Sequence, residues 1–170
     1  MFVPVFPDNA PVISMYDTNL INKEFSDWIA SLNLEISGSE LFHLKPNSDE
    51  NPDSLPIHLD TGGFDNHVKL NFVYCNKPSK MNWFTCNDTS KLQILKTPTG
   101  TEYTLANAED CELVYSAQIG QPSLVNAGML HSVLPVEAER YCFSFTLIKD
   151  GNIITWEQAE EIFKEYVSLV

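Results

Sequence analysis

Short apolar segments separated by turn residues fill the chain from residue 56 to residue 148, and this pattern limits the fold more than any other feature. Each segment is rich in β-branched and aromatic residues, and Gly, Pro and Asn stand between the segments. The predicted strands are 56–60, 67–75, 81–86, 91–96, 101–105, 111–118, 122–126, 130–135 and 140–148. About eight short strands at near-regular spacing are typical of a sandwich or barrel and favour a jelly roll.

The N-terminal part is predicted to add edge strands and a helix. Segments 2–6 and 11–16 are interrupted by prolines, which suits edge strands. Asp17-Thr18 offers a cap for a helix whose apolar residues recur at helical spacing through 20–32. Residues 34–45 then read as a strand, a turn at Ser37-Gly38-Ser39 and a second strand.

At the other end, Thr155-Trp156-Glu157-Gln158 is a capping box, and apolar residues at helical spacing follow it. We expect this helix and the first one to pack outside a sheet. The chain is therefore predicted to form one mainly β domain over residues 1–170, with a double-stranded β-helix (a cupin-like jelly roll) and flanking helices.

Composition narrows the possible partners. A net charge of -13 argues against nucleic acid and against an anionic membrane surface, and it would attract a cationic substrate or simply keep the protein in solution. No apolar run reaches membrane-spanning length, and the N-terminus lacks the basic start of a signal peptide. The cysteines, Cys75, Cys86, Cys111 and Cys142, lack metal-site spacing and are expected to be buried free thiols of a cytoplasmic protein.

A pair of distant motifs carries the chemistry. His58-x-Asp60 stands near the start of the strand series, and His131 stands much later in a strand-like segment. Two imidazoles and one carboxylate are the ligand set of a facial-triad iron(II) site with open positions. His58 and Asp60 point the same way if they share a strand, and His131 is expected to come from a strand on the opposite side of the site.

Arg140 follows His131 after a short turn and opens the next predicted strand. We expect it to lie on the strand beside that of His131 and to point inward. A buried arginine needs an anionic partner, which a ligand carboxylate would provide. The alternative is a surface ion pair with Glu137 or Glu139.

The pattern His58-x-Asp60, His131, Arg140 resembles the 2-oxoglutarate/iron(II)-dependent oxygenase superfamily. The most similar part runs from Asn126 to Val136 and continues at 139–145. The resemblance covers residues 56–148 and implies Fe(II) on the triad, 2-oxoglutarate bound through its distal carboxylate by Arg140, and O2 as the oxidant. It further implies hydroxylation of a C–H bond with release of succinate and CO2.

The sequence departs from the family two residues after Arg140. Many members have Ser or Thr there, whereas this chain has Cys142, a weak hydrogen-bond donor. Ser144 would serve less directly, and Asn71 and Tyr74 are further candidates to hold the co-substrate, although Tyr74 also fits plain core packing. Other candidates have simpler readings: Trp83 and Phe84 as core aromatics rather than a substrate cleft, and His43 and His67 as rim or surface residues.

Substrate contacts are expected from loops at the rim. The acidic, proline-bounded stretch 46–55 fits either a lid or a solvated linker and hints at a basic substrate, either a small molecule or a peptide. The main alternatives to an oxygenase are a cupin-like metal-binding or ligand-binding module without turnover and an interaction protein with incidental histidines. The chain is expected to act as a monomer or homodimer.

Overall fold

The computed structural model describes residues 12–15, 21–46, 56–60, 65–96, 102–134 and 137–166. Their strands form two antiparallel sheets, an arrangement compatible with a β-sandwich. The first sheet has the order β1 (Val12–Met15), β2 (Glu35–Leu44), β11 (Arg140–Lys149), β4 (Val68–Cys75) and β9 (Ser123–Asn126), with β12 (Asn152–Ile153) paired to β11. The second has the order β6 (Gln93–Lys96), β7 (Glu102–Ala106), β3 (Ile57–Leu59), β10 (Leu130–Val133), β5 (Lys80–Cys86) and β8 (Cys111–Gln118).

Every strand predicted between residues 56 and 148 is present, with ends that differ by a residue or two. Segment 11–16 contains β1, whereas 2–6 lies outside the described residues. The turn predicted at Ser37-Gly38-Ser39 is wrong. Residues 35–44 form one strand, because both halves pair with β11. A shift in the pairing register near Gly38 lets the strand continue through the predicted turn. None of the helices in the described ranges is both long and apolar enough to traverse a bilayer.

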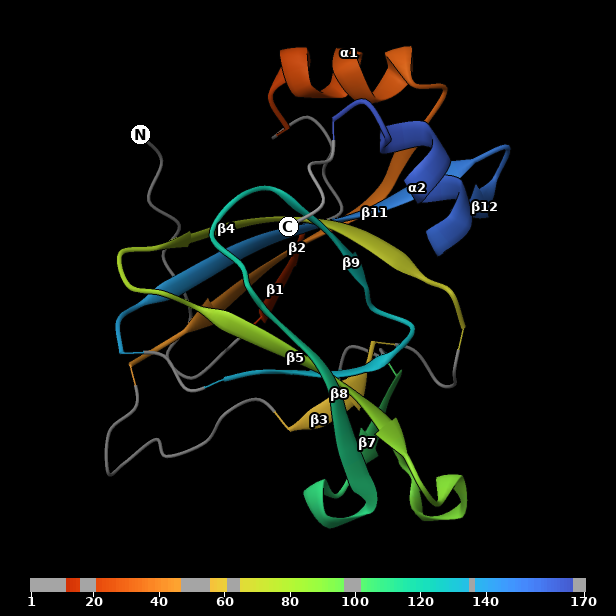
Figure 1. Cartoon of the computed structure of the whole chain (residues 1–170). Helices are drawn as coiled ribbons and strands as arrows, with labels where there is room; N and C mark the ends of the chain where they lie inside the picture. The colour runs from red at the N-terminus through yellow and green to blue at the C-terminus, as the bar shows by residue number, and fades with distance from the viewer. Residues whose placement is uncertain are drawn as a thin grey trace.

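Two helices pack on the outer face of the first sheet, and the second sheet lies on its other side (Figure 1). Helix α1 (Lys23–Ser31) begins at Asn22, whose side chain accepts hydrogen bonds from the backbone N–H groups of Glu24 and Phe25. The predicted cap Asp17-Thr18 lies outside the described residues, and the helix starts later than expected. Helix α2 (Trp156–Phe163) has the predicted capping box between Thr155 and Gln158.

The apolar core has two parts. The outer part fills the space between the helices and the first sheet, and it unites Ile29, Leu34, Val68, Leu70, Phe145, Leu147, Ile154, Ala159 and Phe163. The inner part lies between the sheets and unites Met81, Trp83, Ile119, Val125 and Val133. Both helices therefore cover the outside of a sheet, as the sequence predicted.

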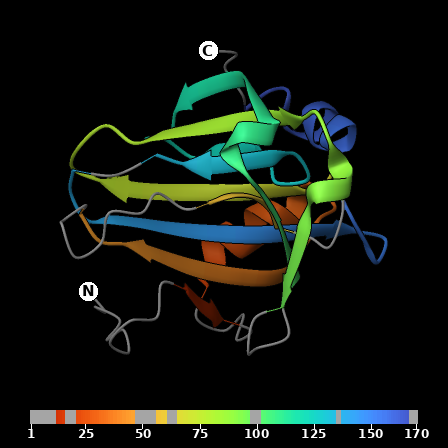
Figure 2. The ribbon, with the colours of Figure 1, turned by 90° about the horizontal axis from the view of Figure 1, so that it is seen from below.

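Figure 2, seen from below, shows the strands of the first sheet side by side, with β11 (blue) between β2 (orange) and β4 (yellow-green). Alternation along β11 decides which side chains reach the space between the sheets. Phe145 faces outward, because its ring lies 5.0 Å from that of Phe25 on α1. Arg140, Cys142 and Ser144 are buried and belong to the alternate set, so they face inward.

Candidate metal centre

His58 and His131 occupy directly opposite positions on β3 and β10. Their ring centroids are 4.4 Å apart, and both residues are buried. Opposed residues of an antiparallel pair project from the same face of the sheet, so the pairing itself brings the two imidazoles together. The expectation that His131 comes from the opposite side of the site is wrong, because β3 and β10 are hydrogen-bonded neighbours.

Asp60 follows the last residue of β3, and its N–H donates to the Ala127 carbonyl at 3.4 Å. Its Oδ1 lies 3.3 Å from His58 Nε2 and 3.7 Å from His131 Nε2. One ligand atom from each of His58, Asp60 and His131 lies within 4.8 Å of the others, and this is the one such group among the residues that the structure describes. The structure thus brings the predicted triad together.

Backbone carbonyls fix how the two imidazoles are presented. His58 donates its Nδ1–H to the Pro56 carbonyl at 2.7 Å, and His131 does the same to Met129 at 2.8 Å. This selects the tautomer whose Nε2 lone pair is free for an ion, as in many metal sites. Burial lowers the pKa of His131 to about 4, although Asp60 opposes the shift, so the imidazole is neutral at pH 7.

Lys69 is a buried cation beside this group and was missed at the sequence level. Its Nζ lies 3.0 Å from Asp60 Oδ2 and 2.7 Å from Glu40 Oε2. Burial alone would lower the pKa of Lys69, but the two carboxylates outweigh it and raise that pKa above its usual value. Burial raises the pKa of Asp60, but the Lys69 ammonium is the strongest opposing influence, and this pKa lies well below its usual range. Both groups are therefore charged at neutral pH.

Arg140 is 3% exposed and faces the interior from the first sheet. Its Nε–H donates to Ser79 Oγ at 2.9 Å, and the Cys142 thiol is within hydrogen-bonding reach. Burial lowers the pKa of Arg140, and the thiols of Cys142 and Cys75 partly offset this. Among the residues that the structure describes, no carboxylate lies within ion-pair distance of the guanidinium.

The burial expected for Arg140 is confirmed, whereas the alternative of a surface ion pair and the expected neighbouring strand are wrong. Arg140 does not form a surface pair with Glu137 or Glu139, because it is buried, and Glu139 accepts a hydrogen bond from Tyr141 instead. It also does not lie on a strand paired with that of His131. The chain crosses from β10 to the other sheet after residue 134, so Arg140 approaches the interior from the facing sheet.

Asn71 and Ser144 sit opposite each other on β4 and β11, on the inward face and between the rows of Arg140 and Lys69. Both are buried, and the Asn71 Oδ1 and Ser144 Oγ atoms have no hydrogen-bond partner in the described part of the chain. Unpaired buried polar atoms are rare in native proteins, and their usual partners are an ordered water, an ion or a ligand. Two of the predicted co-substrate residues are therefore well placed.

Tyr74 is not at the site. It is 72% exposed and shares the outer face with Phe72, because it lies one residue out of step with the inward Val73 and Cys75. Both alternatives for Tyr74, a contact with the co-substrate and plain core packing, are therefore wrong. Tyr103 on β7 lies closer, with its ring 5.8 Å from that of His58, and burial, reinforced by Glu40 and Asp60, raises its pKa to about 12.

The remaining aromatic and histidine candidates are outside the triad. Trp83 is buried opposite His131 and donates its Nε1–H to the Asn126 carbonyl, as a core residue. Phe84 is half-buried on the same strand. His43 stacks on Tyr141, with ring centroids 4.5 Å apart. His67 precedes β4, and its carbonyl accepts from Ala127 and Gly128.

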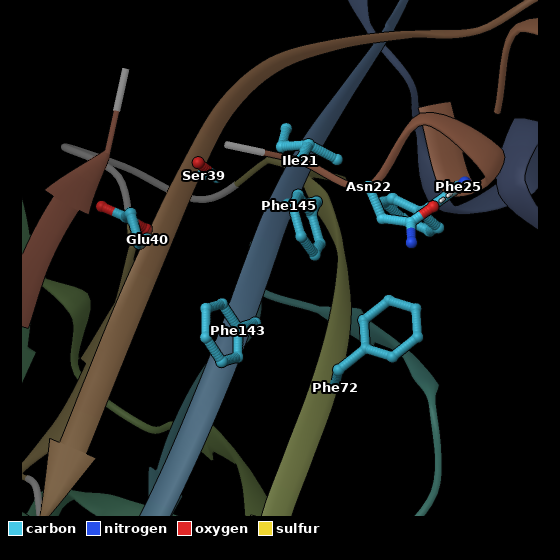
Figure 3. A pocket seen from close by; sticks show the side chains of 8 residues that line it. All are labelled: Ile21, Asn22, Phe25, Ser39, Glu40, Phe72, Phe143 and Phe145. Carbon is cyan, nitrogen blue, oxygen red and sulfur yellow. Dashed lines mark hydrogen bonds between the residues drawn. The ribbon is translucent and has the colours of Figure 1, made fainter. Parts of the chain in front are cut away.

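An apolar pocket of about 380 Å³ lies on the other face of the first sheet, beside helix α1 (Figure 3). Its aromatic lining comes from Phe25, Phe72, Phe143 and Phe145, which face away from the space between the sheets. The side chains of His58, Asp60 and His131 do not line it. The pocket and the triad are therefore separate features on opposite sides of the first sheet.

Loop residues 46–55 lie almost wholly outside the described residues, so their expected role at the rim stays a prediction. All four cysteines are free thiols, although only Cys142 is fully buried. A scan of protein-family models found no match to this chain, and a search of curated proteins found none either.

Proposed function

We propose that the protein is a non-heme iron(II), 2-oxoglutarate-dependent dioxygenase that hydroxylates a C–H bond of a small molecule or a peptide residue. One observation carries this proposal. The space between the sheets holds two imidazoles and a carboxylate with ligand atoms within 4.8 Å of one another, and the facing sheet adds a buried guanidinium without a carboxylate partner among the described residues.

The strand arrangement supports a double-stranded β-helix as the scaffold. Along the chain, β2, β4, β9 and β11 belong to one sheet, and β3, β5, β8 and β10 belong to the other. This division into two antiparallel sets supports the proposal of a jelly roll, in which ligands would enter between the sheets.

Each side chain has a defined part in the proposed site. His58, Asp60 and His131 would hold the iron, which supplies the one-electron chemistry with dioxygen when bound. The guanidinium of Arg140 would pair with the distal carboxylate of 2-oxoglutarate, and its buried location would strengthen this charge-assisted contact. Asn71 and Ser144 lie along the same inward row and offer polar atoms to the co-substrate.

The decisive experiment is anaerobic addition of Fe(II) and 2-oxoglutarate, followed by visible absorption. We expect a weak charge-transfer band in the wild type and no band after His131→Ala. His43→Ala, on the outer face, is the matched control and should keep the band. Succinate release in air then tests turnover. Absence of the band in the folded wild type would contradict the proposal.

A jelly-roll binding module without oxygenase turnover is the second candidate. The ion pair between Lys69 and Asp60 favours it, since the carboxylate is already neutralised by a protein cation at 3.0 Å. The band separates the candidates, because a simple metal-binding module has no chelated 2-oxoglutarate and shows none.

A further inference from the structure

The two carboxylate oxygens of Asp60 have different partners, and the Lys69 ammonium pairs with only one of them. It holds Oδ2 at 3.0 Å, whereas Oδ1 faces both imidazole Nε2 atoms. Glu40 anchors the ammonium from the other side at 2.7 Å, and the side chain of Lys69 is only 8% exposed. The position of Lys69 is thus fixed by two carboxylates and by burial.

This division matters for the number of open positions on a bound ion. An octahedral ion held by two imidazoles and one carboxylate oxygen keeps three exchangeable positions. A chelating co-substrate needs two of them, and dioxygen needs the third. If Asp60 bound through both oxygens, one of these reactants would be excluded.

We infer that Lys69 is a positioning residue that keeps Asp60 a single-oxygen ligand by occupying Oδ2. The inference rests on the proposed function for its consequence in turnover, but its effect on coordination is independent of that function. Lys69 acts here as a fixed cation. Removing it frees Oδ2 for the ion and deletes a positive charge from the neighbourhood of the ion.

The test uses Mn(II) as the probe, and water-proton relaxation counts the exchangeable waters on the bound ion. We expect three waters in the wild type and in Lys69→Arg, and two in Lys69→Met. The affinity for Mn(II) should be equal or higher in Lys69→Met, while succinate release falls by roughly 10–100-fold, as for other residues that orient metal ligands. A purely structural role would lower metal affinity and turnover together.

Lys69→Met removes the cation that pairs with the half-buried Glu40 and Asp60 carboxylates, so Glu40→Gln with and without Lys69→Met forms a second pair of variants. Lys80→Met, an exposed lysine on β5, is the control for loss of charge. An equal water count with and without Lys69, or an equal rate of succinate release in Lys69→Met and an active wild type, overturns the inference. Three waters in the wild type and two in Lys69→Met, with no succinate release from the wild type, would instead contradict the proposed function and leave the role of Lys69 in coordination standing.

A different observation carries a second inference, about Cys86 and Cys111. They lie directly opposite each other at the ends of β5 and β8. The adjacent pair is hydrogen-bonded, because Asn87 N–H donates to the Asp110 carbonyl at 2.9 Å, so the cysteines occupy a non-hydrogen-bonded position. Opposed Cα atoms are about 4.5 Å apart at such positions, within the range that disulfides span.

Both cysteines are half-buried, and the Cys86 thiol donates to the Asp88 carbonyl at 3.4 Å. Between them the chain leaves to form η2 (Thr89–Lys91), β6, β7 and η3 (Ala108–Asp110). Strand β7 pairs with β3, and its Tyr103 contacts the ring of His58. A disulfide would join the two ends of the segment between Cys86 and Cys111. This segment contains β7, which pairs with β3, the strand of His58.

We propose that Cys86 and Cys111 form a reversible disulfide. The two thiols lose two protons and two electrons as the S–S bond forms. A small-molecule disulfide is reduced to two thiols in exchange, or hydrogen peroxide is reduced to two waters.

Titration with oxidised glutathione followed by peptide mass spectrometry tests this proposal. We expect a cross-link between Cys86 and Cys111 with loss of two hydrogens, free thiols at Cys75 and Cys142, and a rise in melting temperature of about 5–10 °C. Cys111→Ser should instead carry glutathione on Cys86 and show no such rise. Free thiols at both positions after oxidation, or a cross-link to Cys75 or Cys142, would overturn the proposal.

Discussion

The imidazoles of His58 and His131 face each other across β3 and β10 with ring centroids 4.4 Å apart, and each is tied through Nδ1 to a backbone carbonyl. Their Nε2 atoms and Asp60 Oδ1 form the candidate metal centre. The arrangement depends on the strand pairing and on the turn between β9 and β10, so the predictions below probe both.

Removal of either imidazole should abolish tight metal binding. We expect His58→Ala or His131→Ala to weaken Co(II) binding by more than roughly 100-fold, since even residues that only orient ligands cost 10–100-fold. Isothermal titration under anaerobic conditions measures this. His43→Ala should bind Co(II) like the wild type, and equal affinity in all the variants would show that the ion binds elsewhere.

Arg140→Leu should weaken 2-oxoglutarate and leave metal affinity intact. A hydrogen bond to a charged group contributes about 1.5–3 kcal/mol, which corresponds to roughly 10–150-fold in affinity. Ser79→Ala removes the acceptor that orients Arg140 Nε and should cost less, about 5-fold. The KM for 2-oxoglutarate and the Kd for Mn(II) separate the two effects. If the KM for 2-oxoglutarate and the Kd for Mn(II) both rise in Arg140→Leu, the variant is misfolded and the prediction fails.

Ser144→Ala should separate stability from ligand affinity. Ser144 Oγ is buried without a hydrogen-bond partner among the described residues, so its removal should leave the free energy of unfolding unchanged or raise it by up to about 1 kcal/mol. If the hydroxyl binds the co-substrate, the same variant weakens 2-oxoglutarate. Urea unfolding and ligand titration check the two parts. A strongly destabilised variant would mean that Ser144 has a partner in the native protein.

Gly128 stands in the turn that connects β9 to β10. A Cβ at this position would collide with the backbone carbonyl of Asp65, whereas a Cβ on Gly38 would meet no atom within 4 Å. We expect Gly128→Ala to destabilise the fold by about 1–3 kcal/mol and to weaken metal binding, because Asp60 and His131 both hydrogen-bond to this turn. Gly38→Ala is the matched control, and similar losses in both variants would refute the prediction.

The metal-free protein should lose stability on acidification between pH 6.5 and about 4. Burial lowers the pKa of His131 to about 4 from 6.5, so the unfolded chain binds more protons in this window and stability rises with pH across it. The full effect is about 3 kcal/mol and is present above pH 6.5. Urea unfolding with a chelator, in the wild type and His131→Gln, measures the difference in slope. Equal slopes in the two proteins would show that His131 does not cause the pH dependence of stability.

Much of the fold was predictable from local sequence. Alternating apolar residues and turn residues predicted the strands from 56 to 148, and Thr155 with Gln158 predicted the start of α2. The hairpin of β11 and β12 also had a local signal that we missed: Asp150-Gly151, both at positive φ, is a typical tight-turn pair. Local signals succeed here because a strand end or a helix cap is decided by a few neighbouring residues.

Only some residues of the candidate site could be predicted from the sequence. Lys69 had a weak signal, since it alternates with Asn71 on a strand of otherwise apolar inward residues, but Ser79 had none. Tyr74 was misplaced because the face of a strand depends on its register, and a shift by one residue exchanges the inner and outer sides.

The sequence by itself determined the residue types: two histidines, an aspartate and an arginine in an order that resembles a known site, within a series of short strands. The tertiary structure alone decided that His58 and His131 are cross-strand neighbours, that Arg140 approaches from the facing sheet, and that Lys69 occupies one oxygen of Asp60. The physical reason is that these contacts join residues far apart in the chain. Which strands pair, and in which register, is settled by packing the whole apolar core at once, and no local pattern specifies it.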